Sequence, residues 1–253
     1  MPYPLIWLQE TDSTNRYLTQ LCDEQGSSLA EMTTIAADFQ TAGKGQRGNH
    51  WEAEPGENLL FSIVLYPTFL EAKNQFAISQ LAALALKDTM EGFTPNISIK
   101  WSNDLYWKDC KMGGILIEHD LQGNMLKRSI IGIGLNINQE TFHSDAPNPV
   151  SLRQITGHHY HRSPILDHFM EHLSFSYRNL QDKGEDYRQL LNERYNESLF
   201  RRLEWHRYVD EHGSFEALLL RTEPDGRLVL LDRENRERKY WFKEVSFVVN
   251  KRR

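Results

Sequence analysis

Short apolar runs alternate with polar segments through the first half of the chain, and six of these runs have the length of β-strands. They cover residues 5–8, 33–37, 59–66, 97–101, 113–119 and 129–138. The run at 59–66, LLFSIVLY, is apolar at nearly every position, which predicts a buried strand. The polar segment DLQGN at 120–124 separates the last two runs and predicts a hairpin between them.

Four segments with helical character lie between and after these strands. The first, at 12–26, opens with the N-cap residue types Asp12, Ser13 and Thr14 and gathers apolar side chains on one face. The second, at 71–93, is rich in leucine and alanine, so we expect it to cover the sheet. Two more helices are expected at 164–181 and 187–196. These elements predict an α+β body with a mixed β-sheet flanked by helices.

The pattern changes near Leu203 to short strands in which polar and apolar residues alternate. The turn EPDGR at 223–227 has Asp-Gly at its centre and predicts a β-hairpin. We therefore predict two domains, a body at 1–196 and a small all-β unit at 197–253. A unit of ~55 residues is small for independent stability, so we expect it to pack on the body.

Composition narrows the class of protein without changing this picture. The 253 residues are 40% hydrophobic and 25% charged with a net charge of −6, an ordinary globular composition. No basic tract, signal peptide or long apolar span indicates DNA or a membrane as partner. Cys22 and Cys110 form no C-x-x-C pair, so neither a disulfide framework nor a thiolate zinc site is indicated. We expect a cytoplasmic protein.

Candidate chemistry begins with the stretch TAGKGQRGNHW at 41–51, in which Gly43, Gly45 and Gly48 match G-x-G-x-x-G. A dinucleotide fingerprint requires a helix to begin at these glycines. Here Pro55 and Gly56 follow instead, and then the strand at 59–66. The loop therefore joins two strands, and neither the protein-kinase motifs nor a Walker pattern accompanies it.

The second stretch, IKWSNDLYWKDCKMGGILIE, places polar residues at a strand end and in the loop that follows, namely Lys100, Asn103, Asp104 and Lys111. Ligand sites favour such strand ends. Gly113 and Gly114 let backbone amides approach a ligand, and a lysine just before them can neutralise an anion. A solvated loop with a tight turn is the alternative interpretation.

The third stretch is IIGIGLNIN at 130–138. Gly132 and Gly134 weaken a strand unless something lies against the backbone there. Asn136 stands among isoleucine and leucine and needs a hydrogen-bond partner, so it is either a ligand-binding or a buried structural asparagine.

Together with DSTN at 12–15, these motifs occur in the order and approximate spacing of the biotin protein ligases, which the chain closely resembles from residue 5 to about residue 155. The C-terminal strands resemble the SH3-like barrel that ends those ligases. Because DSTN begins at Asp12, the resemblance is to the form without an N-terminal DNA-binding domain. We also consider a homodimer.

This resemblance implies a catalytic core similar to class II tRNA synthetases and lipoate ligases. It implies that biotin and Mg²⁺-ATP form biotinyl-5'-adenylate and pyrophosphate, after which the biotinyl group passes to one lysine of a biotin carboxyl-carrier protein or domain of a carboxylase. Mg²⁺ is expected to arrive with ATP rather than to be bound by protein side chains.

The resemblance also implies roles for individual residues. Catalytic roles fall on Lys111, between carboxylate and phosphate, on Lys44, at the phosphates, and on Asp104, which guides the incoming lysine or a magnesium ion. Biotin-contacting positions fall on Ser13, Thr14, Gln40, Gly43, Lys111, Gly114 and Gly132. Nucleotide-binding positions fall on Lys44, Gln46, Arg47, Trp51, Asn103 and Asn136. The loop after Asn136 is expected to close over the adenylate, with Phe142 as a lid aromatic.

One position departs from the family pattern. Many members carry a second basic residue where this chain has Gln46, and a neutral amide lacks the charge that strengthens a bond to an anion. We expect Arg47, the next residue, to take over that role.

Other functions are also considered. A lipoate-protein ligase or octanoyl transferase shares the fold and the acyl chemistry, and a non-catalytic binding module is a further alternative. The segment HFMEH at 168–172 matches the H-x-x-E-H zinc-protease pattern. On a helix, however, His168, Glu171 and His172 lie opposite the apolar face, so we expect them to face solvent.

Overall fold

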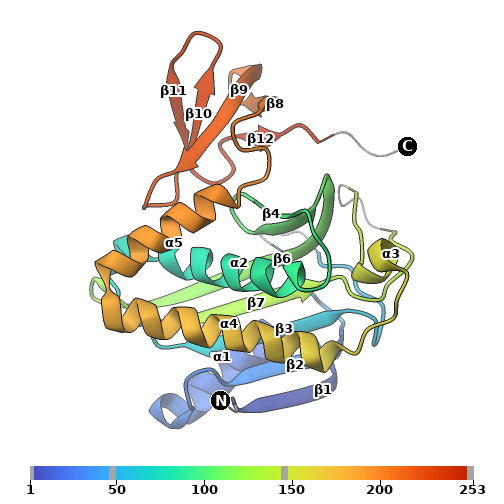
Figure 1. Cartoon of the computed structure of the whole chain (residues 1–253). Helices are drawn as coiled ribbons and strands as arrows, with labels where there is room; N and C mark the ends of the chain where they lie inside the picture. Colours follow the sequence, from blue (N-terminus) through green and yellow to red (C-terminus); the bar gives the residue numbers. More distant parts are fainter. Residues whose placement is uncertain (1–2, 46–49, 144–147, 250–253) are drawn as a thin grey trace.

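The computed structural model describes residues 3–45, 50–143 and 148–249, which form two β-sheets and a set of helices. The larger sheet has seven strands in the order β1-β2-β3-β7-β6-β5-β4 (Figure 1). The strands are β1 (Leu5–Thr11), β2 (Thr34–Gln40), β3 (Leu59–Leu65), β4 (Ile97–Lys100), β5 (Asp104–Trp107), β6 (Cys110–Gln122) and β7 (Met125–Leu135). β1 and β2 are parallel and every other neighbouring pair is antiparallel, so the sheet is mixed as predicted.

Helices cover both faces of this sheet. They are α1 (Thr14–Gln25), α2 (Phe76–Glu91), α3 (Leu152–Thr156), α4 (Arg162–Lys183) and α5 (Glu185–Glu197), with short 3-10 turns η1 (Gly26–Ser28) and η3 (Ala72–Asn74). Figure 1 shows α2 and α4 side by side over one face. The alternation of side chains along β7 decides which helix each residue meets, because successive residues of a strand point to opposite faces. Ile131 and Ile133 join the core formed with α2 and α4, whereas Ile130 packs with Leu18 and Cys22 of α1.

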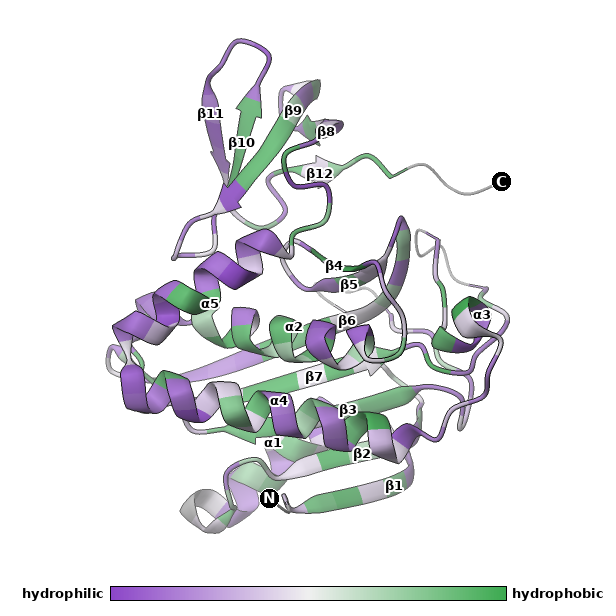
Figure 2. Ribbon diagram, viewed as in Figure 1, coloured by the Kyte–Doolittle hydropathy of each residue, from purple (hydrophilic) through white to green (hydrophobic). Residues whose placement is uncertain are grey.

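Hydropathy follows this layering. In Figure 2 the central strands are mostly hydrophobic, while the outward sides of α4 and α5 are hydrophilic. No helix in the described part of the chain is long and apolar enough to cross a membrane.

The smaller sheet lies beside the end of α5, in the order β11-β10-β9-β8-β12. Its strands are β8 (Trp205–Asp210), β9 (Gly213–Thr222), β10 (Leu228–Asp232), β11 (Glu237–Tyr240) and β12 (Ser246–Phe247). It is joined to the body by side-chain contacts: the indole Nε1 of Trp101 donates to the Gly226 carbonyl at 2.9 Å, and Asn196 accepts from the Thr222 amide at 2.6 Å. The division into two domains at residue 196 stays a prediction.

Most of the expected elements are present, and both hairpins are confirmed. β6 and β7 turn at Gly123, and β9 and β10 turn at 223–227. The sequence pattern did not predict β5 and α3. β5 has only four residues and forms because it pairs with β4 on one side and β6 on the other. α3 has five residues and is stabilised by a capping box between Ser151 and Gln154.

Candidate active site

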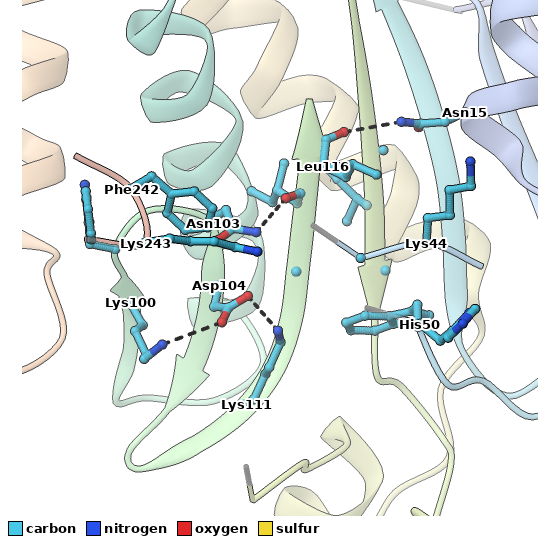
Figure 3. A pocket seen from close by; sticks show the side chains of 18 of the residues that line it. Asn15, Lys44, His50, Lys100, Asn103, Asp104, Lys111, Leu116, Phe242 and Lys243 are labelled. Atoms are coloured by element: carbon cyan, nitrogen blue, oxygen red, sulfur yellow. Dashed lines mark hydrogen bonds and ion pairs between the residues drawn. The ribbon is translucent and has the colours of Figure 1, made fainter. Parts of the chain in front are cut away.

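A cavity of about 540 Å³ lies on the α1 side of the large sheet, where the segment before β12 reaches the body. Cross-strand pairing sets its floor, because directly paired residues point to the same face. Gly114 pairs with Gly134, and Leu116 pairs with Gly132. This pairing extends across the neighbouring strands: Asp104 of β5 pairs with Gly114 of β6, and Lys100 of β4 pairs with Asp104. The sheet thus presents a glycine-lined floor with charged residues at one end (Figure 3).

The space above Gly132 is filled by Asn15, the second residue of α1, whose N-cap is Ser13. A β-carbon at Gly132 would lie 2.2 Å from Asn15 Oδ1. The Asn15 side chain accepts a hydrogen bond from Ser62 Oγ at 2.6 Å and donates to Glu118 at 2.8 Å. Glycine at 132 is therefore required by the packing of α1 on β7.

Trp51 lies over the neighbouring glycines. A β-carbon at Gly134 would lie 2.4 Å from its indole ring, and one at Gly114 would lie 3.3 Å from it. The indole Nε1 is buried and has no hydrogen-bond partner among the described residues. Gly43 supports this position, because its carbonyl accepts from the Trp51 amide at 3.0 Å. A group does lie against Gly132 and against Gly134, as expected. In both cases it is a side chain of this protein, Asn15 at Gly132 and Trp51 at Gly134.

A polar wall stands beside this floor. The Gln40 side-chain oxygen accepts from both the amide and the hydroxyl of Thr14, at 2.7 and 3.1 Å. Ser62 Oγ also lies 2.7 Å from Thr14 Oγ1, within hydrogen-bond distance. Ser13 precedes Thr14 at the N-terminus of α1, and both are nearly inaccessible to solvent. This wall offers hydroxyl and amide groups that can bind a neutral polar ring.

Two lysines share one carboxylate at the charged end. Lys111 Nζ lies 2.7 Å from Asp104 Oδ1, and Lys100 Nζ lies 3.9 Å from Asp104 Oδ2. Lys100 is enclosed by the rings of Tyr106 and Phe247, at 5.5 and 5.1 Å. Burial lowers the pKa of Lys100 below its usual value, and the Asp104 carboxylate partly offsets this effect. The cluster keeps an excess of positive charge facing the cavity.

The backbone of Lys111 is anchored to the segment that leads into α3. Its amide donates to the Asn148 carbonyl at 2.9 Å, and its carbonyl accepts from Val150 at 2.9 Å. Asn136 is buried next to this anchor: its side-chain nitrogen donates to the Val150 carbonyl at 3.3 Å, while its Oδ1 has no partner among the described residues. Asn136 thus holds the segment behind Lys111 and does not line the cavity.

The predicted site residues fall into three groups. Most of them line this one cavity together, namely Ser13, Thr14, Gln40, Lys44, Trp51, Asn103, Asp104, Lys111, Gly114 and Gly132. Gly43 and Asn136 do not line the cavity: Gly43 contacts the lining residues Gln40 and Trp51, whereas Asn136 bonds Met112, Val150 and Leu152, which do not line it. Gln46 and Arg47 lie outside the described residues. Phe142 is partly buried and also does not line the cavity.

Gly45, Lys100 and Gly134 were singled out in the sequence without an assigned role, and all three line the cavity. Other lining residues were not predicted: in the body they are Asn15, His50, Trp101, Ile115, Leu116 and Ile133, and in the C-terminal sheet they are Phe242, Lys243, Val245, Ser246 and Phe247. Asn15 and Trp101 stand inside the motifs DSTN and KWSND, so the motifs themselves were the available signal. The C-terminal residues carry no such signal, because only the packing of the two sheets brings them to the cavity.

The HFMEH residues of α4 lie elsewhere. His168, Glu171 and His172 are exposed, whereas Phe169 and Met170 are buried against the sheet, as the helical spacing predicted. Within residues 3–45, 50–143 and 148–249, no group of three or more His, Cys, Asp and Glu side chains is arranged to hold a metal ion.

Comparisons with known proteins agree with one another. A model of the biotin/lipoate A/B protein ligase family matches residues 7–136. The bifunctional ligase/repressor BirA of Bacillus spizizenii is 28% identical over 242 residues, which cover 93% of this chain and 72% of that protein. The biotin-[acetyl-CoA-carboxylase] ligase of Paracoccus denitrificans is 32% identical, with 63% of this chain and 67% of that protein covered. The structure of biotin protein ligase from Aquifex aeolicus in complex with biotin and ATP has a TM-score of 0.78 at 25% identity, covering 98% of this chain and 99% of that one.

Proposed function

The chain belongs to the biotin/lipoate A/B protein ligase family, and we propose that it uses ATP to attach biotin to a specific lysine of a biotin carboxyl-carrier protein through biotinyl-5'-adenylate. One observation carries the assignment of the site. The cation cluster around Lys111 and the hydroxyl and amide wall around Thr14 and Gln40 face the same cavity. A ligand with a neutral polar ring at one end and a carboxylate at the other can occupy both.

Biotin has this shape. Its ureido ring suits the wall formed by Ser13, Thr14 and Gln40, and its carboxylate reaches toward Lys111. The Trp51 indole already borders the space above Gly114, so we place the bicyclic ring beside that indole on the floor of the cavity. The floor at Gly132 is already covered by Asn15, so we assign the contact with biotin there to Asn15 instead of the glycine backbone.

The first reaction joins two anions. A carboxylate oxygen of biotin attacks the α-phosphorus of ATP, the bond from that phosphorus to the oxygen shared with the β-phosphate breaks, and pyrophosphate leaves with the electron pair. Cations that face the developing charge accelerate such a step. We assign Lys111 to the carboxylate and α-phosphate, and Lys44 to the phosphates.

The second reaction transfers the biotinyl group. The carrier's lysine first loses its ammonium proton, the free amine attacks the carboxyl carbon, AMP leaves with the electron pair of the broken C–O bond, and the nitrogen gives up a second proton to solvent. We assign Asp104 to binding the incoming ammonium group and to receiving its first proton, because its carboxylate faces the cavity beside Lys111. Asn103, whose side chain donates to the Ile115 carbonyl at 2.8 Å, holds the loop in front of Asp104.

Magnesium accompanies ATP in this chemistry. Asp104 is the one carboxylate among the described residues that line the cavity, and two lysines already contact it. This fits an ion that keeps several waters and is held mainly by phosphate oxygens, with Asp104 as an additional ligand. When bound, the ion neutralises phosphate charge.

The same proposal identifies the partner of the protein. A carboxyl-carrier domain of a biotin-dependent carboxylase is the partner, and DNA and membranes are not. A cytoplasmic location and a possible homodimer stay predictions.

The experiment combines the protein with ATP, magnesium and a carrier domain, and supplies either biotin or lipoate. Mass spectrometry of the carrier is expected to show one added biotinyl group on one lysine, dependent on ATP, and little lipoyl addition. Addition of lipoate in preference to biotin would assign the chain to the lipoate branch of the family. Absence of both, with a carrier that a known ligase modifies, would contradict the proposal.

A further inference from the structure

The C-terminal sheet sends one tight turn, residues 241–244, to the cavity wall. Figure 3 shows Phe242 and Lys243 of this turn on the side of the cavity opposite Lys44 and His50. The turn is fixed at both ends: the Trp241 amide donates to the Glu244 carboxylate at 2.6 Å, and the Glu244 amide donates to the Trp241 carbonyl at 3.1 Å. Phe242 also packs edge-on against Trp101, with ring centroids 6.0 Å apart.

Lys243 has an unusual backbone for its residue type. Its φ is 72°, in the left-handed region that favours glycine. Among the described residues that line the cavity, it is the one non-glycine residue with a positive φ. Glycine or asparagine would adopt this backbone more readily, so the geometry of the turn does not by itself account for a lysine here.

Its charge is also uncompensated. Lys100 and Lys111 are both contacted by Asp104, whereas neither Lys243 nor Lys44 forms an ion pair with any described residue. Two lysines without an ion pair to a described residue therefore line opposite sides of the cavity, one from the body and one from the C-terminal sheet. This arrangement suits an extended polyanion better than a single carboxylate.

We propose that Lys243 binds the β- and γ-phosphates of ATP and thus holds the pyrophosphate that leaves in the first reaction. This proposal rests on the proposed ligase function. Lys111 is assigned to the carboxylate and α-phosphate and Lys44 to the phosphates from the opposite wall, so the lysine of the C-terminal sheet can bind the phosphates of the leaving group from the other side. A side chain in this role contributes to binding ATP and pyrophosphate and contacts neither biotin nor AMP.

The two half-reactions separate this role from others. Adenylate formation involves the β- and γ-phosphates, but transfer from preformed biotinyl-5'-adenylate to the carrier does not. Loss of Lys243 should therefore impair the first half-reaction and spare the second.

The test variant is Lys243→Gly, which removes the charge and relieves the backbone strain, so that a folding defect is not expected. Lys108→Gly is the matched control, because Lys108 is also an exposed lysine with positive φ, 51°, and does not line the cavity. Lys243→Arg restores the charge. For Lys243→Gly we expect the KM for ATP in biotin-dependent adenylate formation to rise roughly 10- to 100-fold, the loss of one charge-assisted contact. The KM for biotin and the rate of transfer from supplied adenylate should stay unchanged.

Three outcomes would overturn the proposal: equal KM values for ATP in Lys243→Gly and Lys108→Gly, an equal loss in the transfer half-reaction, or no recovery in Lys243→Arg. The first would leave Lys243 without a role in ATP binding. The second would place it against the adenylate or the carrier. Failure of the wild-type chain to form any adenylate would instead contradict the ligase function itself.

Discussion

Asp104 sets the charge of the candidate site at the scale of single residues. Its carboxylate lies between Lys111 and Lys100, and all three side chains are largely buried. Interactions between charges are stronger in such a site than in water. One carboxylate for two ammonium groups leaves a positive surface toward the cavity, which suits a reaction between two anions.

Lys111→Ala should abolish adenylate formation. The substitution removes a cation aimed at the reacting groups, and the loss of one such contact corresponds to at least ~100-fold in rate. The fold should persist, because the Lys111 side chain is not part of the apolar core. Biotin-dependent pyrophosphate exchange measures the effect, with Lys127→Ala on the exposed end of β7 as the control. Near wild-type exchange in Lys111→Ala would disprove the role.

Lys100 should make stability depend on pH in the alkaline range. Burial lowers its pKa in the folded chain, so between that lowered pKa and the ordinary value of 10.5 the unfolded chain binds more protons than the folded chain. The free energy of unfolding therefore gains a contribution that rises with pH through this window.

Urea unfolding of the wild type and of Lys100→Met at several pH values from 7 to about 10.5 tests this. The stability of the wild type relative to the variant should increase with pH. A constant difference would show that Lys100 has an ordinary pKa, and Lys127→Met serves as the exposed control.

At the scale of elements, the site is made by the contact between α1 and β7. The N-terminal residues of α1 occupy the space that the missing side chains of β7 leave open. Because Asn15 also bonds Ser62 of β3, the helix, two strands and the polar wall form one hydrogen-bonded unit. A change in any of them should therefore affect both stability and ligand binding.

Gly132→Ala is the sharpest probe of this contact. The added methyl group would overlap Asn15, which must then give up its hydrogen bonds to Ser62 and Glu118. We expect a loss of about 1–3 kcal/mol in stability, as for overpacking of a tight interior, together with weaker biotin binding. Gly92→Ala is the control, because the nearest atom there is 3.3 Å away and the backbone is helical. Thermal unfolding and biotin titration report the two effects, and an unchanged Gly132→Ala protein would refute the packing role.

At the scale of the whole molecule, the two sheets meet at the edge of the cavity. Trp101 follows β4 and joins them, since its indole donates to the Gly226 carbonyl and its ring contacts Phe242. The C-terminal sheet therefore completes the site instead of standing apart from it.

Trp101→Phe should loosen this connection. It keeps an aromatic ring against Phe242 but removes the hydrogen bond to Gly226, which contributes about 1 kcal/mol. We expect a lower melting temperature and a higher KM for ATP, because the turn at 241–244 is positioned through this contact. Trp205→Phe, a change at a partly exposed tryptophan of β8 outside the cavity, is the control. Equal effects of the two changes on the KM for ATP would argue against a shared site.

Much of this molecule could be read from its sequence. Apolar periodicity located six strands of the large sheet and four helices, because burial and backbone geometry are imposed locally along each element. The glycines of β7 indicated that something lies against that strand, since a strand interior gains nothing from missing side chains. The ordered motifs pointed to the family, and most of the site residues predicted from them line the cavity.

The tertiary structure alone decided which groups meet. Short β5 exists because strands on both sides pair with it, and its position brings Asp104 between Lys100 and Lys111. That Asn15 and Trp51 cover the two glycines, and that a turn more than 100 residues further along the chain brings Lys243 to the cavity, follows from the docking of separate elements. Contacts between residues far apart in sequence depend on how whole surfaces pack, and no local pattern in the chain records that.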